Sequence, residues 1–404
     1  MARGADPTRM TSRAASSPWK RTAILFLGHL VNDGYGELLT PLLPLLIKRL
    51  DLSLAMAGLL GTFRIVINSL AQPIFGLLVD RMERPVFAVV GPAVTVIAMS
   101  LVGLALSYPA LALLMLASGL GSALFHPAAA TYVGRGADRN RGLLMAFFGS
   151  GGTFGASLAP ILVVPFVMTF GFERTAWLVI PGLAAVLLIG IRLLRAPRGP
   201  REAPPSPAQA DGDCTVRLPR RFAILWIAIV LRSLAGTTFS YFMAVLITSL
   251  GGSPFVAAAG LTTFWFAGAA GEYAAGHLSD RHGRKPILFW AMLLATPFLL
   301  AFLYAPRSLH LPFLALAGVF LYASNPVGIV AAQECLPGRT GLVTGLVMGF
   351  AWGIGGLALG PLGRLADLYG LVPVMTWIGF LPLLSAILVL FYRENAVGKG
   401  RLRQ

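Results

Sequence analysis

The sequence contains few charged residues for its length. Only 12% of the 404 residues are charged, and 16 Asp and Glu stand against 32 Lys and Arg, whereas 56% of the residues are hydrophobic. A soluble protein cannot bury that much apolar sequence in one core and still cover itself with polar side chains. The composition therefore excludes an ordinary soluble protein and indicates a chain that crosses a membrane many times.

Cysteines and catalytic motifs are also scarce. The two cysteines, Cys214 and Cys335, are far apart in sequence, so neither a disulfide framework nor a zinc-binding spacing follows. The motifs H-E-x-x-H and G-x-S-x-G and paired-cysteine metal sites do not occur in the sequence. We therefore expect no enzymatic activity, no cofactor and no metal ion.

Long apolar stretches dominate what is present. An α-helical span needs about 20 mostly apolar residues to cross roughly 30 Å of hydrocarbon. The chain has twelve such stretches, at 22–47, 54–79, 86–107, 109–133, 142–169, 175–195, 222–250, 254–278, 287–305, 309–333, 341–363 and 372–392. The sequence thus predicts an all-α membrane protein with twelve transmembrane helices.

The distribution of basic residues predicts the orientation. With twelve spans both termini lie on one side, and a cytoplasmic N-terminus puts 25 of the 32 Lys and Arg in the cytoplasm and five in the opposite loops. Cytoplasmic loops of membrane proteins carry this excess of basic residues. The net charge of +16 therefore reports topology, and we expect no nucleic-acid partner. The N-terminal segment is polar and basic, and the first span that follows it contains Asp33 and Glu37. Such a span is a poor hydrophobic region for a signal peptide, so we expect no cleaved signal peptide.

One Pro-rich and charged segment, 196–221, lacks helical periodicity and divides the chain. We expect it to be a cytoplasmic linker between two six-helix halves, 22–195 and 222–392. Short cytoplasmic tails, 1–21 and 393–404, complete the predicted organisation.

The two halves share a repeated loop motif. GLLVDRMERP at 76–85 returns as GHLSDRHGRKP at 276–286, and HPAAATYVGRGADRNRG at 126–142 aligns with NPVGIVAAQECLPGRTG at 325–341. At an offset of 200, the loop motif pairs Gly76 with Gly276, Asp80 with Asp280, Arg81 with Arg281, and Arg84 with Arg284. Parallel six-helix repeats are typical of alternating-access transporters of the major facilitator type.

The same eight residues are candidates for gating. An Asp at a helix end with Arg at +1 and +4 can form charge-assisted pairs with a neighbouring helix, which hold an inner gate in one state. The alternative is a solvated turn that merely obeys the positive-inside rule.

Five ionisable residues lie well inside the predicted spans: Asp33, Glu37, Arg64, Arg232 and Glu272. A charge at the bilayer centre costs several kcal/mol, so such residues face a water-filled cavity or a partner. Asp33 and Glu37 share one helix face, and either is placed at a suitable depth to pair with Arg64. Three carboxylates against two guanidinium groups leave at least one acid without a permanent partner. We interpret that acid as a proton carrier.

The candidate site residues fall into two groups. Proton coupling is assigned to Asp33, Glu37, Glu272 and His126. The substrate cavity is assigned to His29, Asn32, Arg64, Arg232, Tyr241 and Asn325. Two structural alternatives stay open, because a lone His beside a Pro is often a satisfied structural group, and Glu272 could instead anchor the second loop motif by pairing with Arg281 or a neighbour.

The motif G-x-x-x-D-R-x-x-R resembles the loop signature of the major facilitator superfamily, and the whole chain resembles its fosmidomycin-resistance family. The residues that carry the resemblance are GHLVND (28–33), GLGSALFHP (119–127), GSGGTFGASLAP (149–160) and AQECLPGRTGLVTGLVMGFAWGIGGLALGPLGRLAD (332–367). The resemblance implies a proton-coupled exporter of drugs in the bacterial inner membrane. A proton symporter that imports a small metabolite is the alternative, because this fold transports in either direction. The expected partners are a small-molecule substrate, protons and membrane lipids, and we expect a monomer.

The topology makes a direct prediction. Single cysteines are placed at Pro205 or at Ser107 in a chain lacking Cys214 and Cys335. In intact cells an impermeant thiol reagent should label the cysteine at Ser107 and spare the one at Pro205, because only the first lies in a predicted external loop. Labelling of Pro205→Cys from outside would overturn the predicted orientation.

Overall fold

The computed structural model describes residues 18–79, 85–134, 141–195, 219–336, 339, 343 and 345–393, and every regular element within these ranges is a helix. The first half contains α1 (Pro18–Gly36), α2 (Leu39–Leu50), α3 (Leu54–Val79), α4 (Phe87–Ser100), η2 (Leu101–Leu104), α5 (Tyr108–Gly134), α6 (Arg141–Phe170), η3 (Phe172–Leu178) and α7 (Val179–Arg195). The second half contains α8 (Arg220–Ser249), α9 (Pro254–His282), α10 (Arg284–Tyr304), η5 (Arg307–Leu309), α11 (His310–Cys335), η6 (Gly345–Phe350), α13 (Ala351–Tyr369), α14 (Leu371–Gly379) and α15 (Leu381–Phe391).

The described elements reproduce the predicted spans closely. In the described residues, eleven helical segments are long and apolar enough to cross a membrane. The repeat is also visible in the helix boundaries, because α3 begins at Leu54 and α9 begins at Pro254, an offset of 200. Most of the predicted linker and both tails lie outside the described residues, although α1 begins at Pro18 and α8 at Arg220, slightly earlier than predicted.

The first predicted span, 22–47, is not one helix. It divides into α1 and α2, and Glu37 and Leu38 lie at the break. Proline has no backbone N–H, so Pro41 cannot donate to the carbonyl of Glu37 and Pro44 cannot donate to that of Thr40. The turn is closed instead by the Leu38 N–H, which donates to the Tyr35 carbonyl at 3.1 Å. The break places a carboxylate beside backbone that is no longer fully helical.

Two other predicted spans depart from regular α-helix in the second half. The span predicted at 341–363 includes a π-helical turn, η6, before α13 begins at Ala351. The span predicted at 372–392 divides at Phe380, where Pro382 has no N–H to donate to the Ile378 carbonyl. Irregular backbone at membrane depth is tolerated where it is buried in protein or lines a cavity.

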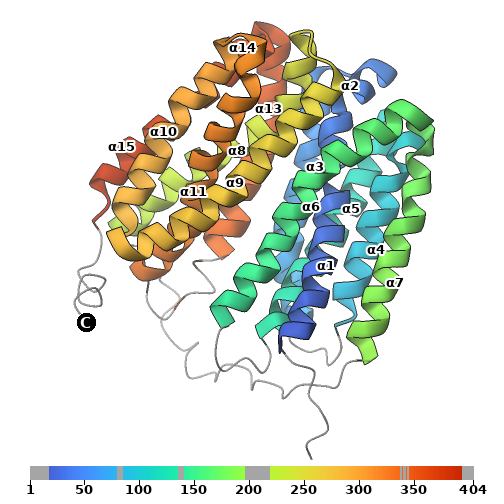
Figure 1. Ribbon diagram of the computed structural model, residues 1–404, viewed down its shortest axis with the longest axis horizontal. Coiled ribbons are helices and arrows are strands. Elements are labelled where there is room, and N and C mark those ends of the chain that lie inside the picture. Colours follow the sequence, from blue (N-terminus) through green and yellow to red (C-terminus); the bar gives the residue numbers. More distant parts are fainter. Residues whose placement is uncertain are drawn as a thin grey trace, which may run out of the picture.

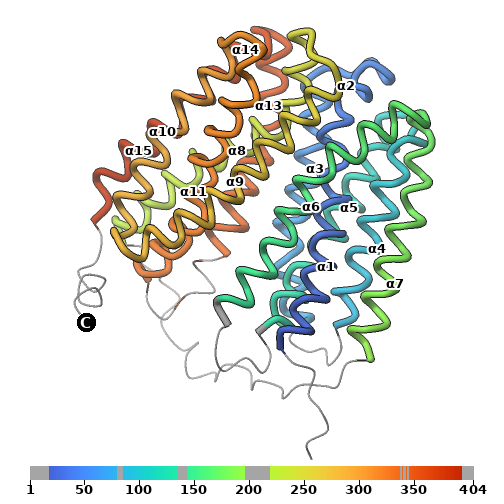
Figure 2. The backbone as a smooth tube through the Cα atoms, viewed as in Figure 1, coloured from blue at the N-terminus to red at the C-terminus, as the bar shows by residue number. Residues whose placement is uncertain are grey.

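The two halves form two bundles that meet at one end and separate at the other (Figure 1). We call the end at which α3 begins and α13 ends the converging end, and the end at which α1 begins and α7 ends the diverging end. The tube view shows α1 to α7 on one side and α8 to α15 on the other (Figure 2). The halves contact each other chiefly through α3 against α13 and α6 against α9.

Glycine allows the closest of these contacts. A Cβ atom on Gly58 of α3 would collide with the carbonyl of Leu359, and one on Gly363 of α13 would collide with the carbonyl of Leu54. Small residues let helix backbones approach closely in membranes. The converging end is therefore a backbone-to-backbone contact between the halves.

Candidate functional site: a polar cavity between the halves

A cavity of about 340 Å³ lies between the two halves. Eight of the ten predicted site residues line it: Asp33, Glu37, Arg64, His126, Arg232, Tyr241, Glu272 and Asn325. The other two, His29 and Asn32, are buried behind the cavity wall at 8% and 1% exposure. All five ionisable residues of the predicted spans thus reach one cavity, as the cost of charge in hydrocarbon requires.

Glu37 pairs with Arg64, which resolves the pairing left open by the sequence. The Arg64 Nη1 atom lies 3.0 Å from Glu37 Oε1, and both side chains are about one-fifth exposed, at 18% and 23%. Glu37 is fixed further by Thr40, whose hydroxyl donates to the second carboxylate oxygen at 3.1 Å. The carboxylate at the break between α1 and α2 therefore joins this helix to α3.

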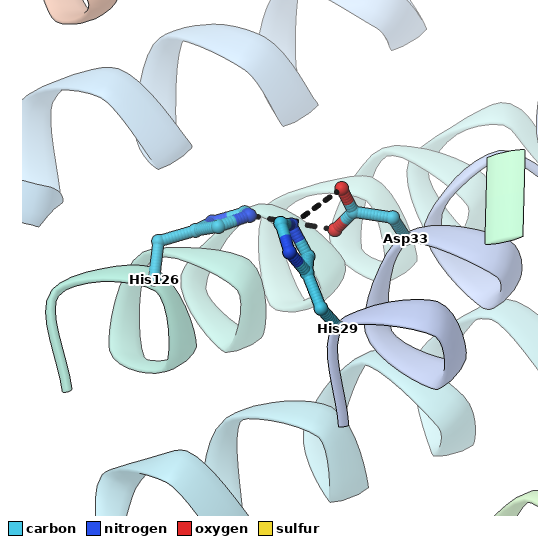
Figure 3. Close-up of side chains that lie close together, drawn as sticks. All are labelled: His29, Asp33 and His126. Atoms are coloured by element: carbon cyan, nitrogen blue, oxygen red, sulfur yellow. Dashed lines mark ion pairs between the residues drawn. The ribbon is translucent and has the colours of Figure 1, made fainter. Parts of the chain in front are cut away.

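Asp33 is at ion-pair distance from two histidines, and the three side chains lie close together (Figure 3). His29 Nε2 is 3.1 Å from Asp33 Oδ2, and His126 Nε2 is 3.4 Å from Asp33 Oδ1. His29 and Asp33 are one turn apart on α1, whereas His126 comes from α5. We call these three residues the His–Asp–His cluster.

The Nδ1 atom of each imidazole ring accounts for one of its hydrogens. His29 Nδ1 lies 2.9 Å from the Phe148 carbonyl, and His126 Nδ1 lies 3.0 Å from the Ser122 carbonyl. A carbonyl oxygen only accepts, so each Nδ1 carries a hydrogen and donates. In a neutral ring the remaining Nε2 would then present a lone pair to a carboxylate oxygen.

Asn32 holds the cluster from behind. Its amide nitrogen donates to Asp33 Oδ1 at 2.8 Å, and its amide oxygen accepts from the Thr95 hydroxyl at 3.1 Å. Ser122 is within 3.3 Å of both the Asn32 amide nitrogen and His126 Nδ1. Asn32 thus orients Asp33 from within the protein, although the sequence placed it in the cavity wall.

The same cluster is the group of described residues with the spacing of a metal site, because its potential ligand atoms lie within 4.8 Å of one another. However, the two imidazoles face different oxygens of Asp33 rather than one shared point. Each imidazole Nε2 atom is therefore at ion-pair distance from its own carboxylate oxygen.

The second half contributes a separate polar group. Asn325 donates to Glu272 Oε1 at 2.7 Å, and the Arg232 guanidinium lies 5.4 Å from the centre of the Tyr322 ring. Arg232 Nε donates to the Leu321 carbonyl at 3.0 Å. The contact between Glu272 and Asn325 holds this carboxylate at the cavity wall, so the alternative that it pairs with Arg281 is not what the structure shows.

Two guanidinium nitrogens at the cavity have no hydrogen-bond partner among the described residues. They are Nε of Arg64 and Nη2 of Arg232. Arg232 is only 4% exposed. A buried donor left unpaired costs about 1–3 kcal/mol, and more for a charged group. Both arginines therefore retain hydrogen-bonding capacity at the cavity.

Tyr241 lines the cavity but uses its hydroxyl elsewhere. The hydroxyl donates to the Ala57 carbonyl of α3 at 2.6 Å, across the boundary between the halves. The sequence predicted a cavity residue, and the structure adds a contact that joins α8 to α3 toward the converging end.

The second loop motif forms an ion-pair group at the diverging end. Arg284 Nη1 lies 2.6 Å from Asp280 Oδ1, and Arg284 Nε lies 3.4 Å from Glu334 Oε1 on α11. Arg281 is exposed, and a Cβ atom on Gly276 would meet nothing within 4 Å. Gly76 lies in α3, whereas Asp80, Arg81 and Arg84 lie outside the described residues.

Several contributors escaped the sequence analysis. Phe148 and Leu321 act through backbone carbonyls, which carry no sequence signal. Tyr322 could have been found, since it lies three residues before Asn325 on the same predicted span and also lines the cavity. A polar cavity between two repeated helical halves is typical of multi-pass membrane transporters.

Comparison with known proteins gives the family. The family model of the Major Facilitator Superfamily matches residues 25–224 and 225–403, and the chain belongs to this superfamily. The chain is 32% identical over 411 residues to the Fosmidomycin resistance protein of Escherichia coli (strain K12), covering 98% of this chain and 99% of that protein. It is 26% identical over 370 residues to the MFS-type transporter YfnC of Bacillus subtilis (strain 168), covering 90% of each.

Solved structures agree on the fold. A bacterial homolog of the human lysosomal transporter Spinster, in an inward-facing and occupied conformation, gives a TM-score of 0.77 at 16% identity over 95% of this chain and 99% of that chain. A D-xylose-proton symporter gives a TM-score of 0.77 at 17% identity with the same coverage. The prediction of a major facilitator fold with two six-helix halves is confirmed.

The Glu37–Arg64 pair makes a stability prediction. Arg64→Gln should lower the thermal unfolding temperature, because it leaves a largely buried carboxylate unpaired at a cost of about 1–3 kcal/mol. Glu37→Gln combined with Arg64→Gln should recover part of that loss, since no unpaired charge remains. The measurement is thermal unfolding of the purified proteins in detergent. A double variant less stable than Arg64→Gln alone would show that the two charges are not coupled.

Proposed function

We propose that this protein is a proton-coupled exporter of a small molecule from the bacterial cytoplasm. The observation that carries the proposal is the His–Asp–His cluster, a protonatable group at the wall of the cavity between the two halves. The similarity to a protein named for fosmidomycin resistance supports export and supports an antibacterial drug as one substrate. Proton flow into the cell would drive the export.

The orientation follows from the charges of the loops. The positive-inside rule favours cytoplasmic termini, and α1 begins at the diverging end. The halves separate at this end and touch at the other, which supports an inward-open state of the cavity (Figure 1). In this state the substrate enters from the cytoplasm and a proton leaves to it.

The number of hydrogens that the His–Asp–His cluster requires supports its proposed role in proton coupling. Both Nδ1 atoms donate to carbonyls, so each attractive contact between Nε2 and Asp33 needs one further hydrogen between the two atoms. The observed arrangement therefore corresponds to a cluster that holds two such protons. If one proton leaves, one contact becomes a repulsion between lone pairs, and that ring must move.

His126 is the exit for this proton. Its contact with Asp33 is 3.4 Å, against 3.1 Å for His29, and its side chain is 26% exposed, against 10% for His29. His126 also lines the cavity, whereas His29 does not. The longer and more exposed contact therefore marks the side of the cluster that faces the cavity, and in the proposed mechanism the proton leaves by this side while the diverging end is open.

The arginines support an anionic group on the substrate. Arg64 and Arg232 lie in opposite halves, on α3 and α8, and each has a buried nitrogen without a partner among the described residues. An oxyanion in the cavity that both arginines line would form charge-assisted hydrogen bonds with the two guanidinium groups. Since such a group contacts both halves, its binding favours the conformational change that carries it outward.

Export itself is the first test. Expression of the gene in a drug-sensitive bacterial host should raise the inhibitory concentration of fosmidomycin or of another compound in a panel of phosphonate and amphiphilic drugs. The matched control is the same plasmid with the Arg232→Leu variant at equal abundance, because it lacks one anion contact. Greater sensitivity across the panel would instead indicate an importer.

The second test measures whether Asp33 is needed for proton coupling. In proteoliposomes, Asp33→Asn should abolish transport driven by a proton gradient, while substrate exchange without a gradient should persist and lose its pH dependence. An amide keeps the shape of the carboxyl group but cannot carry the proton. The matched variant is Glu37→Gln, one turn away on the same face.

The two variants separate the possible outcomes. If only Glu37→Gln lost proton-driven transport, the His–Asp–His cluster would be rejected as the proton site. The hypothesis that transport is coupled to protons would still stand. Normal pumping by both variants would reject the carboxylates of the first span and move the proton site to Glu272. Tight binding of Zn²⁺ to the purified protein, lost on His126→Ala, would assign the cluster to a metal ion instead.

A further inference from the structure

A carboxylate from the second half caps a helix of the first half at the converging end. Asp367, near the end of α13, accepts hydrogen bonds from two backbone groups of α3: the Leu54 N–H at 2.8 Å and the Ala55 N–H at 3.0 Å. The first N–H groups of a helix have no partner within that helix and carry partial positive charge. A carboxylate is the strongest side-chain acceptor for them.

The repeat shows that this contact exceeds ordinary capping. Ser53 accepts from the Met56 N–H at 3.1 Å, and Ser253 accepts from the Val256 N–H at 3.3 Å, so α3 and α9 begin with the same local cap. Only α3 receives a second cap from the opposite half among the described contacts. The helix of the opposite half that packs most on α9 is α6, and its corresponding stretch, 165–168, is the apolar sequence PFVM.

The first residue of each helix completes the asymmetry. Leu54 offers an N–H to Asp367, whereas Pro254 occupies the same position of α9 and has no N–H. A carboxylate facing α9 would therefore find one donor fewer. Both halves therefore have the serine cap, whereas only α3 has the additional charged contact among the described residues.

Further hydrogen bonds cross the same boundary. Thr62 of α3 donates to the Gly356 carbonyl at 2.7 Å, and Thr262 of α9 donates to the Ser157 carbonyl at 2.7 Å. Those two bonds are neutral and related by the repeat. The contact of Asp367 is the charged one, and it has no counterpart in the other pair of helices among the described residues.

We propose that Asp367 is a one-sided lock, which holds α3 to α13 at the converging end and biases the transporter toward the conformation in which this end is closed. Alternating access requires the converging end to open, and opening exposes the two amide groups and separates them from the carboxylate. The lock therefore sets the population of the alternate state. The α6–α9 contact, which lacks the charge, is the weaker side of the closure.

The experiment measures opening directly. Ala57, which is fully buried beside Tyr241, is replaced by cysteine in a chain whose own cysteines have been removed, and the rate of reaction with a water-soluble thiol reagent is followed by mass spectrometry in lipid nanodiscs. When closing is faster than labelling, that rate is proportional to the open population. The contact is solvent-exposed, so Asp367→Asn should accelerate labelling about two- to fivefold, the order expected for loss of an exposed charge at a helix N-terminus.

Two further variants test the lock from its other side. Leu54→Pro copies the Ser-Pro start of α9 and removes one of the two N–H donors, and proline is well tolerated at the first position of a helix. It should accelerate labelling a few-fold, and the combination with Asp367→Asn should add nothing to Asp367→Asn alone. This variant keeps the test decisive if Asp367→Asn fails to fold.

Asp51→Asn is the matched control, because it removes the same charge three residues before α3. Asp51 has a left-handed backbone (φ 48°), which asparagine also adopts readily. Its labelling rate should equal that of the parent. Equal rates for Asp367→Asn and Asp51→Asn, or additive effects of Leu54→Pro and Asp367→Asn, would overturn the lock. The readout needs no transport, so its outcome is independent of proton coupling and export.

Discussion

The cost of placing charge in hydrocarbon organises this molecule. An uncompensated charge at membrane depth costs several kcal/mol, so every ionisable side chain of the spans must find a partner or water. The helices satisfy this requirement by turning their ionisable residues toward a single cavity between the halves. The outer surfaces that face lipid are left to apolar residues. In the part of the chain that the structure describes, the cavity therefore gathers these ionisable side chains in one place, where a substrate would meet them.

The two halves use the same backbone positions for different chemistry. His126 of the first half aligns with Asn325 of the second, and each contacts a carboxylate, Asp33 or Glu272 respectively. An imidazole exchanges protons near neutral pH, whereas an amide does not. The repeat therefore supplies one scaffold with a protonatable contact on one side and a fixed contact on the other. Under the proposed function, this difference would give the proton a defined place in an otherwise pseudo-symmetric cavity.

Much of this arrangement was predictable from the sequence, and the limits are physical. Span length follows from membrane thickness, so α3 occupies 54–79 as predicted. The break after Gly36 was missed, although Pro41 and Pro44 signal it. Depth along a helix predicted that Asp33 or Glu37 would pair with Arg64, but the choice depends on how α1 is rotated against α3, which periodicity leaves undetermined. The carbonyl of Phe148, which fixes the His29 ring, is identical in every residue type and is invisible to sequence analysis.

The polar contacts of the His–Asp–His cluster lie within one half, whereas those of the converging end join the two halves. The His–Asp–His cluster lies wholly within the first half, so a change in its protonation cannot by itself pull the halves together or apart. Coupling needs an element that senses the cluster and also touches the second half. α6 meets both requirements, because Phe148 accepts from His29 while Ser157 of the same helix accepts from Thr262 of α9. Movement of the His29 ring would therefore act on α6, and α6 would transmit it to the side of the closure that lacks the charged cap.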